Sequence, residues 1–171
     1  MGLFDGQERI EEIIRQGGSL ERWYSNSGVP LMKAIEKALV RDGKDVVTKM
    51  GDNGKLILEY FMYHNYEALK VIIMEDEHLG PCFNTLYPVE TRHLTSNDIE
   101  CILQAANANC KTGIVIYNES VDTFCYIFAY ETNEFVPEGI SVDILLCMAN
   151  EETNNVLDYL DTLRECFNLY T

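Results

Sequence analysis

The side chains with the clearest chemical potential lie in ILQAANANCKTGIVIYN, positions 102–118, where two amides, a thiol and an amine follow one another. A cation beside a thiol lowers the pKa of the thiol, so Lys111 could activate Cys110 as a nucleophile. The apolar residues of the stretch recur at helical spacing, however, and Cys110 falls on their face. Asn107 and Asn109 suit a helix terminus, where their amides can bond free carbonyl groups. We therefore predict a junction between a helix and a strand rather than a reactive site.

Metal-capable side chains are concentrated in MEDEHLGPC, positions 74–82. Their spacing matches no zinc pattern, and consecutive residues of an extended chain point to opposite sides. A solvated turn between two strands explains the stretch better than a metal site. The candidates in it are Glu75, Asp76, Glu77, His78 and Cys82.

Support for a catalytic site in the sequence is equally weak. The three histidines, His64, His78 and His93, each lie in or beside a predicted turn or strand end. Asp158 and Asp161 form a carboxylate pair on the polar face of the predicted last helix, where solvated carboxylates are common. The sequence contains no GxSxG, HExxH or GxGxxG motif and no glycine-rich phosphate loop. We predict no catalytic, cofactor-binding or metal-binding residues and no cofactor, in a protein that is not an enzyme.

Charge constrains the partners of the chain. Acidic residues outnumber basic residues by 28 to 13 over 171 residues, for a formal net charge of −15. Such a field repels phosphate backbones, so we predict that the protein does not bind nucleic acid. It favours a basic or amphipathic segment of a protein partner, although an acidic surface also serves solubility alone.

Composition also suggests a compartment. No segment approaches the roughly 20 apolar residues that span a bilayer. The start, MGLFDGQERIEE, lacks the basic and apolar regions of a secretory signal. We predict a cytoplasmic protein without membrane contact, whose six cysteines are reduced and mostly buried.

Apolar periodicity predicts the elements that position these side chains. Helical spacing indicates a short helix after Asp5 and a second that begins at Pro30. The period then changes to two, and Asn53-Gly54 is a strong hairpin signal. The predicted strands cover 56–63, 68–75, 82–87, 114–117 and 121–130. A helix capped by Thr95 separates the third and fourth of these strands, and an amphipathic helix closes the chain.

These elements predict an α+β fold, an antiparallel sheet with helices mainly on one face. The predicted order is α-βββ-α-ββ-α plus an N-terminal helical extension. Residues 1–28 form this extension, and residues 29–171 form a single domain without an internal repeat or linker.

The strand VDTFCYIFAY, positions 121–130, alternates aromatic with smaller apolar residues, so that four aromatics share one face. These are Phe124, Tyr126, Phe128 and Tyr130. A strand that is apolar on both faces must be covered on both, and the helices of the chain supply one cover. The other cover could be more of the core, a partner or a second subunit. We predict a homodimer with these four aromatics at or near the contact, or a monomer in which the N-terminal helices cover them.

The order of elements, with ILQAANANCKTGIVIY and YIFAYETNEFVPEGISVDILLCMANEETNNVLDYLDTL, resembles the YbjN family of bacterial sensory transduction regulators. At the level of the fold it also resembles type III secretion chaperones. The first match is a helix that ends in paired Asn before a strand, and the second joins a strand, a Gly-Ile-Ser helix entry and an acidic amphipathic helix. The resemblance covers roughly residues 30–170. It implies a small, acidic, dimeric protein that binds other proteins and has no catalytic residues.

Three functions stay open at this point. The expected one is a non-enzymatic protein-binding module, chaperone-like or a regulatory adaptor, in the bacterial cytosol. The second is a small-ligand sensor or cryptic enzyme whose pocket, between sheet and helices, Tyr60, Tyr63 and Tyr66 could line. The third is an immunity-type protein whose acidic surface neutralises a basic toxin.

Overall fold

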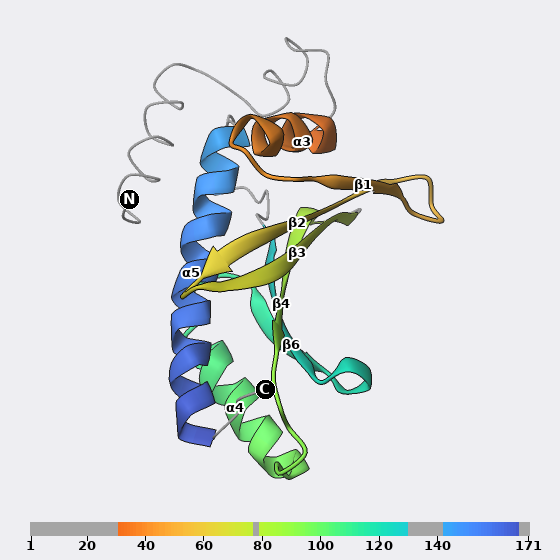
Figure 1. Cartoon of the computed structure of the whole chain (residues 1–171). Coiled ribbons are helices and arrows are strands. Elements are labelled where there is room, and N and C mark those ends of the chain that lie inside the picture. The colour runs from red at the N-terminus through yellow and green to blue at the C-terminus, as the bar shows by residue number, and fades with distance from the viewer. Residues whose placement is uncertain (1–30, 77–78, 130–141, 168–171) are drawn as a thin grey trace.

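Three α-helices and a six-stranded sheet make up the part of the chain that the computed structural model describes, residues 31–76, 79–129 and 142–167 (Figure 1). The order is α3 (Leu31–Arg41), β1 (Val47–Met50), β2 (Leu56–His64), β3 (Glu67–Asp76), β4 (Gly80–Pro88), α4 (Ser96–Ala108), β5 (Ile114–Asn118), the 3-10 turn η1 (Glu119–Val121), β6 (Thr123–Ala129) and α5 (Val142–Phe167).

This order confirms the predicted α+β fold. Four strands rather than three precede α4, because β1 pairs with β2 across the predicted Asn53-Gly54 turn. The predicted helical extension, residues 1–28, lies outside the described residues.

Neighbouring strands of the sheet are all antiparallel, in the order β1-β2-β3-β4-β6-β5. Asn65 and Tyr66 alone connect β2 to β3, and both have positive φ. Two-residue turns with positive φ match the twist of a hairpin, and Asn tolerates this conformation well. The turn therefore fixes the register in which His64 pairs with Glu67.

The helices lie on one face of the sheet, as predicted. In Figure 1, α5 runs across this face, α3 lies near one end of α5, and α4 lies near the other. With 26 residues, α5 is about 39 Å long, enough to cross several strands. The start of α4 is the predicted capping box, in which Thr95 and Asp98 each accept a hydrogen bond from the backbone N–H of the other.

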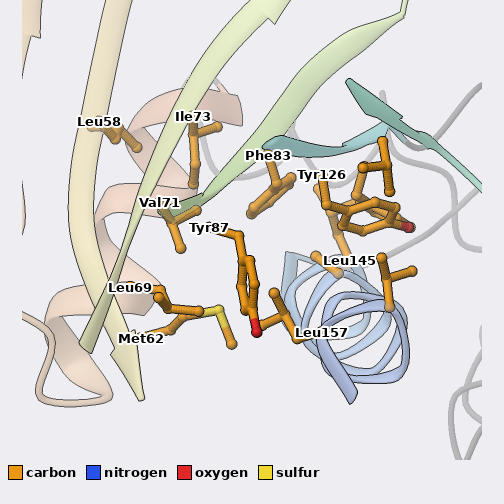
Figure 2. Packing of buried hydrophobic residues seen from close by; sticks show 14 of the residues in the cluster. Leu58, Met62, Leu69, Val71, Ile73, Phe83, Tyr87, Tyr126, Leu145 and Leu157 are labelled. Carbon is orange, nitrogen blue, oxygen red and sulfur yellow. The ribbon is translucent and has the colours of Figure 1, made fainter. Parts of the chain in front are cut away.

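The core lies between the sheet and α5 (Figure 2). Strand alternation sends every second side chain of β2, β3, β4 and β6 into it. Its largest fully buried side chains are aromatic, and they come from the neighbouring interior strands β4 and β6. These are Phe83, Tyr87, Phe124, Tyr126 and Phe128.

Candidate functional site

The predicted contact surface on β6 is part of the core. Phe124, Tyr126 and Phe128 have 0–1% of their surface exposed, so the prediction that they meet a partner or a second subunit is wrong. The physical reason is that the helices cover the face that these aromatics share, and the smaller residues of β6 point the other way. Tyr130 lies outside the described residues.

The opposite face of the sheet, which we call the outer sheet face, carries exposed apolar side chains at its two ends, whereas Cys82 and Cys125 near its middle are buried. No described helix lies on this side (Figure 1). Along each strand, side chains that point into the core alternate with side chains on the outer sheet face. The exposed apolar side chains of the outer sheet face lie at both ends of the sheet. They are Val47 on β1, Phe61 and Tyr63 on β2, Met74 on β3, and Ile114 and Ile116 on β5.

Charge on the outer sheet face is balanced. Lys49 forms an ion pair with Glu59, at 3.1 Å between Nζ and Oε2, and Lys70 lies 6.0 Å from the ring centroid of Phe61. Among the strand residues that the structure describes, Asp76, at the end of β3, is the other acid on this side of the sheet. The face is therefore close to neutral on a chain whose net charge is −15.

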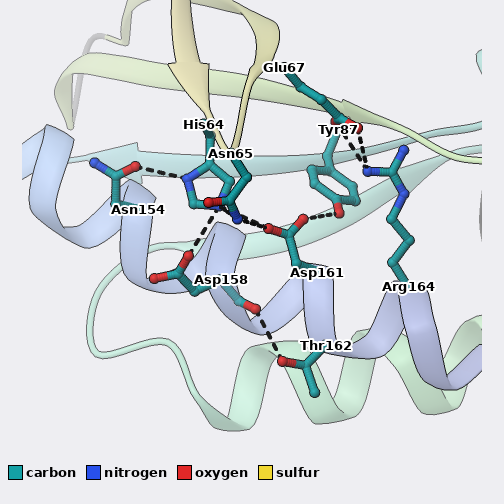
Figure 3. A network of polar contacts seen from close by, with 9 residues as sticks. All are labelled: His64, Asn65, Glu67, Tyr87, Asn154, Asp158, Asp161, Thr162 and Arg164. Atoms are coloured by element: carbon teal, nitrogen blue, oxygen red, sulfur yellow. Dashed lines mark hydrogen bonds and ion pairs between the residues drawn. The ribbon is translucent and has the colours of Figure 1, made fainter.

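A second candidate site lies on the helical side, where the β2–β3 turn meets α5 (Figure 3). His64 ends β2 and extends the inward-facing series of that strand. Asn154, Asp158 and Asp161 follow one another on α5 at intervals of four and three, so they share one helix face. We call these four residues the His64 cluster.

The contacts in the His64 cluster are short. Nε2 of His64 lies 3.1 Å from Oδ1 of Asp158 and 3.0 Å from Oδ2 of Asp161. Nδ1 of His64 lies 3.0 Å from Oδ1 of Asn154, an acceptor that a hydrogen on Nδ1 would satisfy. The imidazole is 7% exposed, whereas Asp158 is 67% exposed and opens the cluster to solvent.

Two side chains beside the His64 cluster, Tyr87 and Arg164, connect it to the sheet. The hydroxyl of Tyr87, a core residue, donates to Oδ1 of Asp161. Burial, followed by the contact with Asp161, raises the pKa of Tyr87 well above its usual value, so the phenol stays protonated. Arg164, one turn further along α5, makes two hydrogen bonds to Glu67 at 2.9 and 3.1 Å and lies over the Tyr87 ring.

Sequence reasoning singled out His64, Asp158 and Asp161 separately, missed Asn154, and did not bring these residues together. Asp158 and Asp161 are on the polar face of the last helix, as predicted, yet His64 and Tyr87 meet Asp161 there. The spacing of Asn154, Asp158 and Asp161 on one helix face was the available signal. Nothing in the sequence indicated which strand would supply their partner.

The stretch at positions 102–118 is a junction, as predicted. The amide of Asn107 bonds the backbone of Val115 twice, as donor to its carbonyl at 2.9 Å and as acceptor from its N–H at 2.7 Å. Asn109 caps α4 and donates to the carbonyl of Ala105. Burial, then the charge of Glu152, raises the pKa of Cys110, which disfavours a reactive thiolate.

None of the six cysteines, all of which the structure describes, forms a disulfide, but fewer are buried than predicted. Cys82 and Cys125 are buried, Cys110 and Cys147 are half-buried, and Cys101 and Cys166 are exposed.

Two other sets of candidates do not converge. In the acidic stretch, Glu75 and Asp76 are exposed at the end of β3, whereas Glu77 and His78 lie outside the described residues. The tyrosines predicted to line a pocket point in different directions. Tyr60 is half-buried against the core, whereas Tyr63 and Tyr66 are exposed.

Comparisons with family models, curated proteins and solved structures gave no match. Within residues 31–76, 79–129 and 142–167, no helix is both long and apolar enough to cross a membrane. Function therefore has to follow from the outer sheet face and the His64 cluster.

Proposed function

We propose that the protein is a non-enzymatic binding module of the bacterial cytosol that holds an amphipathic segment of another protein on its outer sheet face. The observation that carries the proposal is the set of exposed apolar side chains on that face. Phe61 is 52% exposed and Tyr63 75%, although both lie within a strand. Large apolar groups gathered on one face of a folded chain are typical of protein-binding surfaces.

Geometry favours an amphipathic partner. Side chains on one face of a strand repeat about every 6.6 Å, and neighbouring strands lie about 4.8 Å apart. An amphipathic helix presents apolar residues at i, i+3, i+4 and i+7, about 5–6 Å apart. This spacing is close to the spacing of side chains on the sheet. Burial of the apolar area would then supply roughly 25 cal/mol per Å² towards binding.

Charge favours basic flanks on that segment. The outer sheet face is near neutral, so it accepts apolar side chains without burying an unpaired charge. The remainder of the chain is strongly acidic, and α5 alone carries six acidic residues against one basic residue. This field attracts basic flanks and repels nucleic acid.

A selected peptide tests the proposal. Peptides that bind the whole protein are selected from a random display library, and the affinity of the consensus peptide is measured by fluorescence anisotropy. We expect apolar residues at helical spacing with basic flanks. Phe61→Asp should weaken binding at least about tenfold, because it places a charge in the apolar contact. The fold should tolerate it, since Lys70 faces position 61 on β3.

Val40→Asp is the matched control, because Val40 is 56% exposed but lies on α3, on the other side of the sheet. It should bind the peptide within about twofold of the parent chain. Equal binding by Phe61→Asp and the parent would overturn the proposal.

A second copy is the other occupant that a neutral apolar face accepts, in an isologous dimer. Light scattering distinguishes a monomer, whose outer sheet face is free for a partner segment, from such a dimer. A 19.6 kDa species agrees with a free face. A dimer that Phe61→Asp dissociates would assign the face to self-association instead of a partner segment.

A further inference from the structure

The His64 cluster has an electrostatic conflict. Nδ1 of His64 donates to Asn154, and the amide nitrogen of Asn65, a donor, lies 3.2 Å from Nε2. Two carboxylate oxygens also lie 3.0 and 3.1 Å from Nε2. Two anionic oxygens this close to one ring nitrogen need a positive charge between them. Either a proton on Nε2, in an imidazolium, or a cation bound by the lone pair of Nε2 supplies that charge.

The distances suit a metal ion. An octahedral ion with bonds of about 2.1 Å holds neighbouring donor atoms about 3.0 Å apart, whereas a tetrahedral ion of the same bond length holds them about 3.4 Å apart. The two separations at Nε2 match the octahedral value. The ligand atoms of His64, Asp158 and Asp161 all lie within 4.8 Å of one another.

The surroundings of these atoms also suit a metal. A ligating histidine usually donates its second ring N–H to an acceptor, which fixes its tautomer, and Asn154 takes that role for His64. A ligating carboxylate is usually hydrogen-bonded through its other oxygen, and the buried Tyr87 hydroxyl does this for Asp161.

We propose that Nε2 of His64, Oδ1 of Asp158 and Oδ2 of Asp161 bind a divalent first-row transition-metal ion of octahedral preference. One imidazole favours Mn²⁺ or Co²⁺ over Mg²⁺ and Ca²⁺, which prefer oxygen ligands alone. The exposed side of Asp158 leaves the remaining positions to water. The ion would join the β2–β3 turn to α5, and the site is independent of the outer sheet face.

Calorimetry with Mn²⁺ and Co²⁺ on the metal-stripped protein tests this proposal. We expect one ion per chain and no matching event with Mg²⁺. At 100 times its Kd, the ion should raise the Tm by about 5–10 °C. Asp158→Asn should weaken binding at least about tenfold. It is the mildest change to the fold because Asp158 is the most exposed ligand. Glu100→Gln, which removes an exposed charge from α4, should leave binding unchanged.

Paramagnetic NMR locates the ion. Substoichiometric Mn²⁺ should broaden the imidazole signals of His64 and spare those of His93, which is exposed and bonds the carbonyl of Phe167. Absence of 1:1 binding, equal binding by Asp158→Asn, or equal broadening of the two imidazoles would overturn the proposal. The His64 cluster would then be a contact between protein groups alone.

Discussion

The imidazole of His64 lies 3.0 Å from the carboxylate of Asp161, although 97 residues separate them along the chain. This contact joins the tip of the β2–β3 hairpin to the second half of α5. It also brings the carboxylate within reach of the Tyr87 hydroxyl on β4. One aspartate therefore links two strands to the helix that covers them.

Asp161→Ala should destabilise the metal-free protein. The change leaves the buried Tyr87 hydroxyl and the His64 ring without their acceptor, which costs about 1–3 kcal/mol. Asp158→Ala is the control, since its carboxylate is 67% exposed, and the change should cost less than about 1 kcal/mol. Urea unfolding in the presence of a chelator measures both values. Equal costs for the two variants would mean that Asp161 has no special structural role.

Tyr66→Gly should stabilise the protein. Tyr66 has φ +67 and a fully exposed side chain, so it contributes strain and no packing. Glycine adopts this conformation freely, and Asn-Gly is the preferred pair in such turns. The gain should be about 0.5–1 kcal/mol in thermal or urea unfolding, after the extra flexibility of glycine in the unfolded chain is offset. A loss of stability would show that the Tyr66 ring makes a contact in solution.

These features show which information the sequence carries. Alternation in β6 correctly predicted a strand with one aromatic face, because the period of a strand is two. Periodicity does not reveal which face a helix will cover, so the aromatics Phe124, Tyr126 and Phe128 were assigned to a contact surface when they fill the core. The neighbouring exposed face, with Phe61 and Tyr63, became visible only in the assembled sheet.

The His64 cluster was beyond sequence reasoning for a related reason. Helical spacing placed Asp158 and Asp161 on one face, and a turn was predicted at His64. Their meeting depends on the hairpin register, which puts His64 at the last position of β2, and on the direction of α5 across the sheet. By contrast, the Asn107 junction was predicted because all its determinants lie within a few residues.

Gly113→Ala should destabilise the protein strongly. Gly113 has φ +78, and a Cβ there would lie 2.3 Å from the carbonyl oxygen of Ile127, so strand β6 would have to move. Gly43→Ala is the matched control, because Gly43 has φ +86 but open space around it. We expect a cost of about 1–2 kcal/mol for Gly43→Ala from backbone strain alone, and at least about 2 kcal/mol more for Gly113→Ala. Similar values in urea unfolding would contradict the close approach of Gly113 to β6.

Thiol labelling should separate the cysteines by exposure. Cys101 and Cys166 are exposed and should react first with a thiol reagent at neutral pH. Burial raises the pKa of Cys125 to about 11, so its thiolate is scarce and its labelling should be slowest. Mass spectrometry of peptides over time measures each rate, and denaturation should expose all six thiols. Rapid native labelling of Cys110 would contradict its helix-junction role and restore it as a reactive residue.

Thr85→Val should stabilise the protein. Thr85 lies on β4 between Val71 and Tyr126, with 1% of its surface exposed, and among the described residues its hydroxyl has no hydrogen-bond partner. Valine has nearly the same shape and removes the unpaired polar group, which should gain about 1 kcal/mol. Thr85→Ser keeps the hydroxyl and loses a methyl group, so it should cost about 1 kcal/mol. Opposite signs for the two variants in urea unfolding are therefore expected. If valine destabilises the chain, the hydroxyl has a partner in solution, and a buried water beside Tyr126 would be the first group to look for.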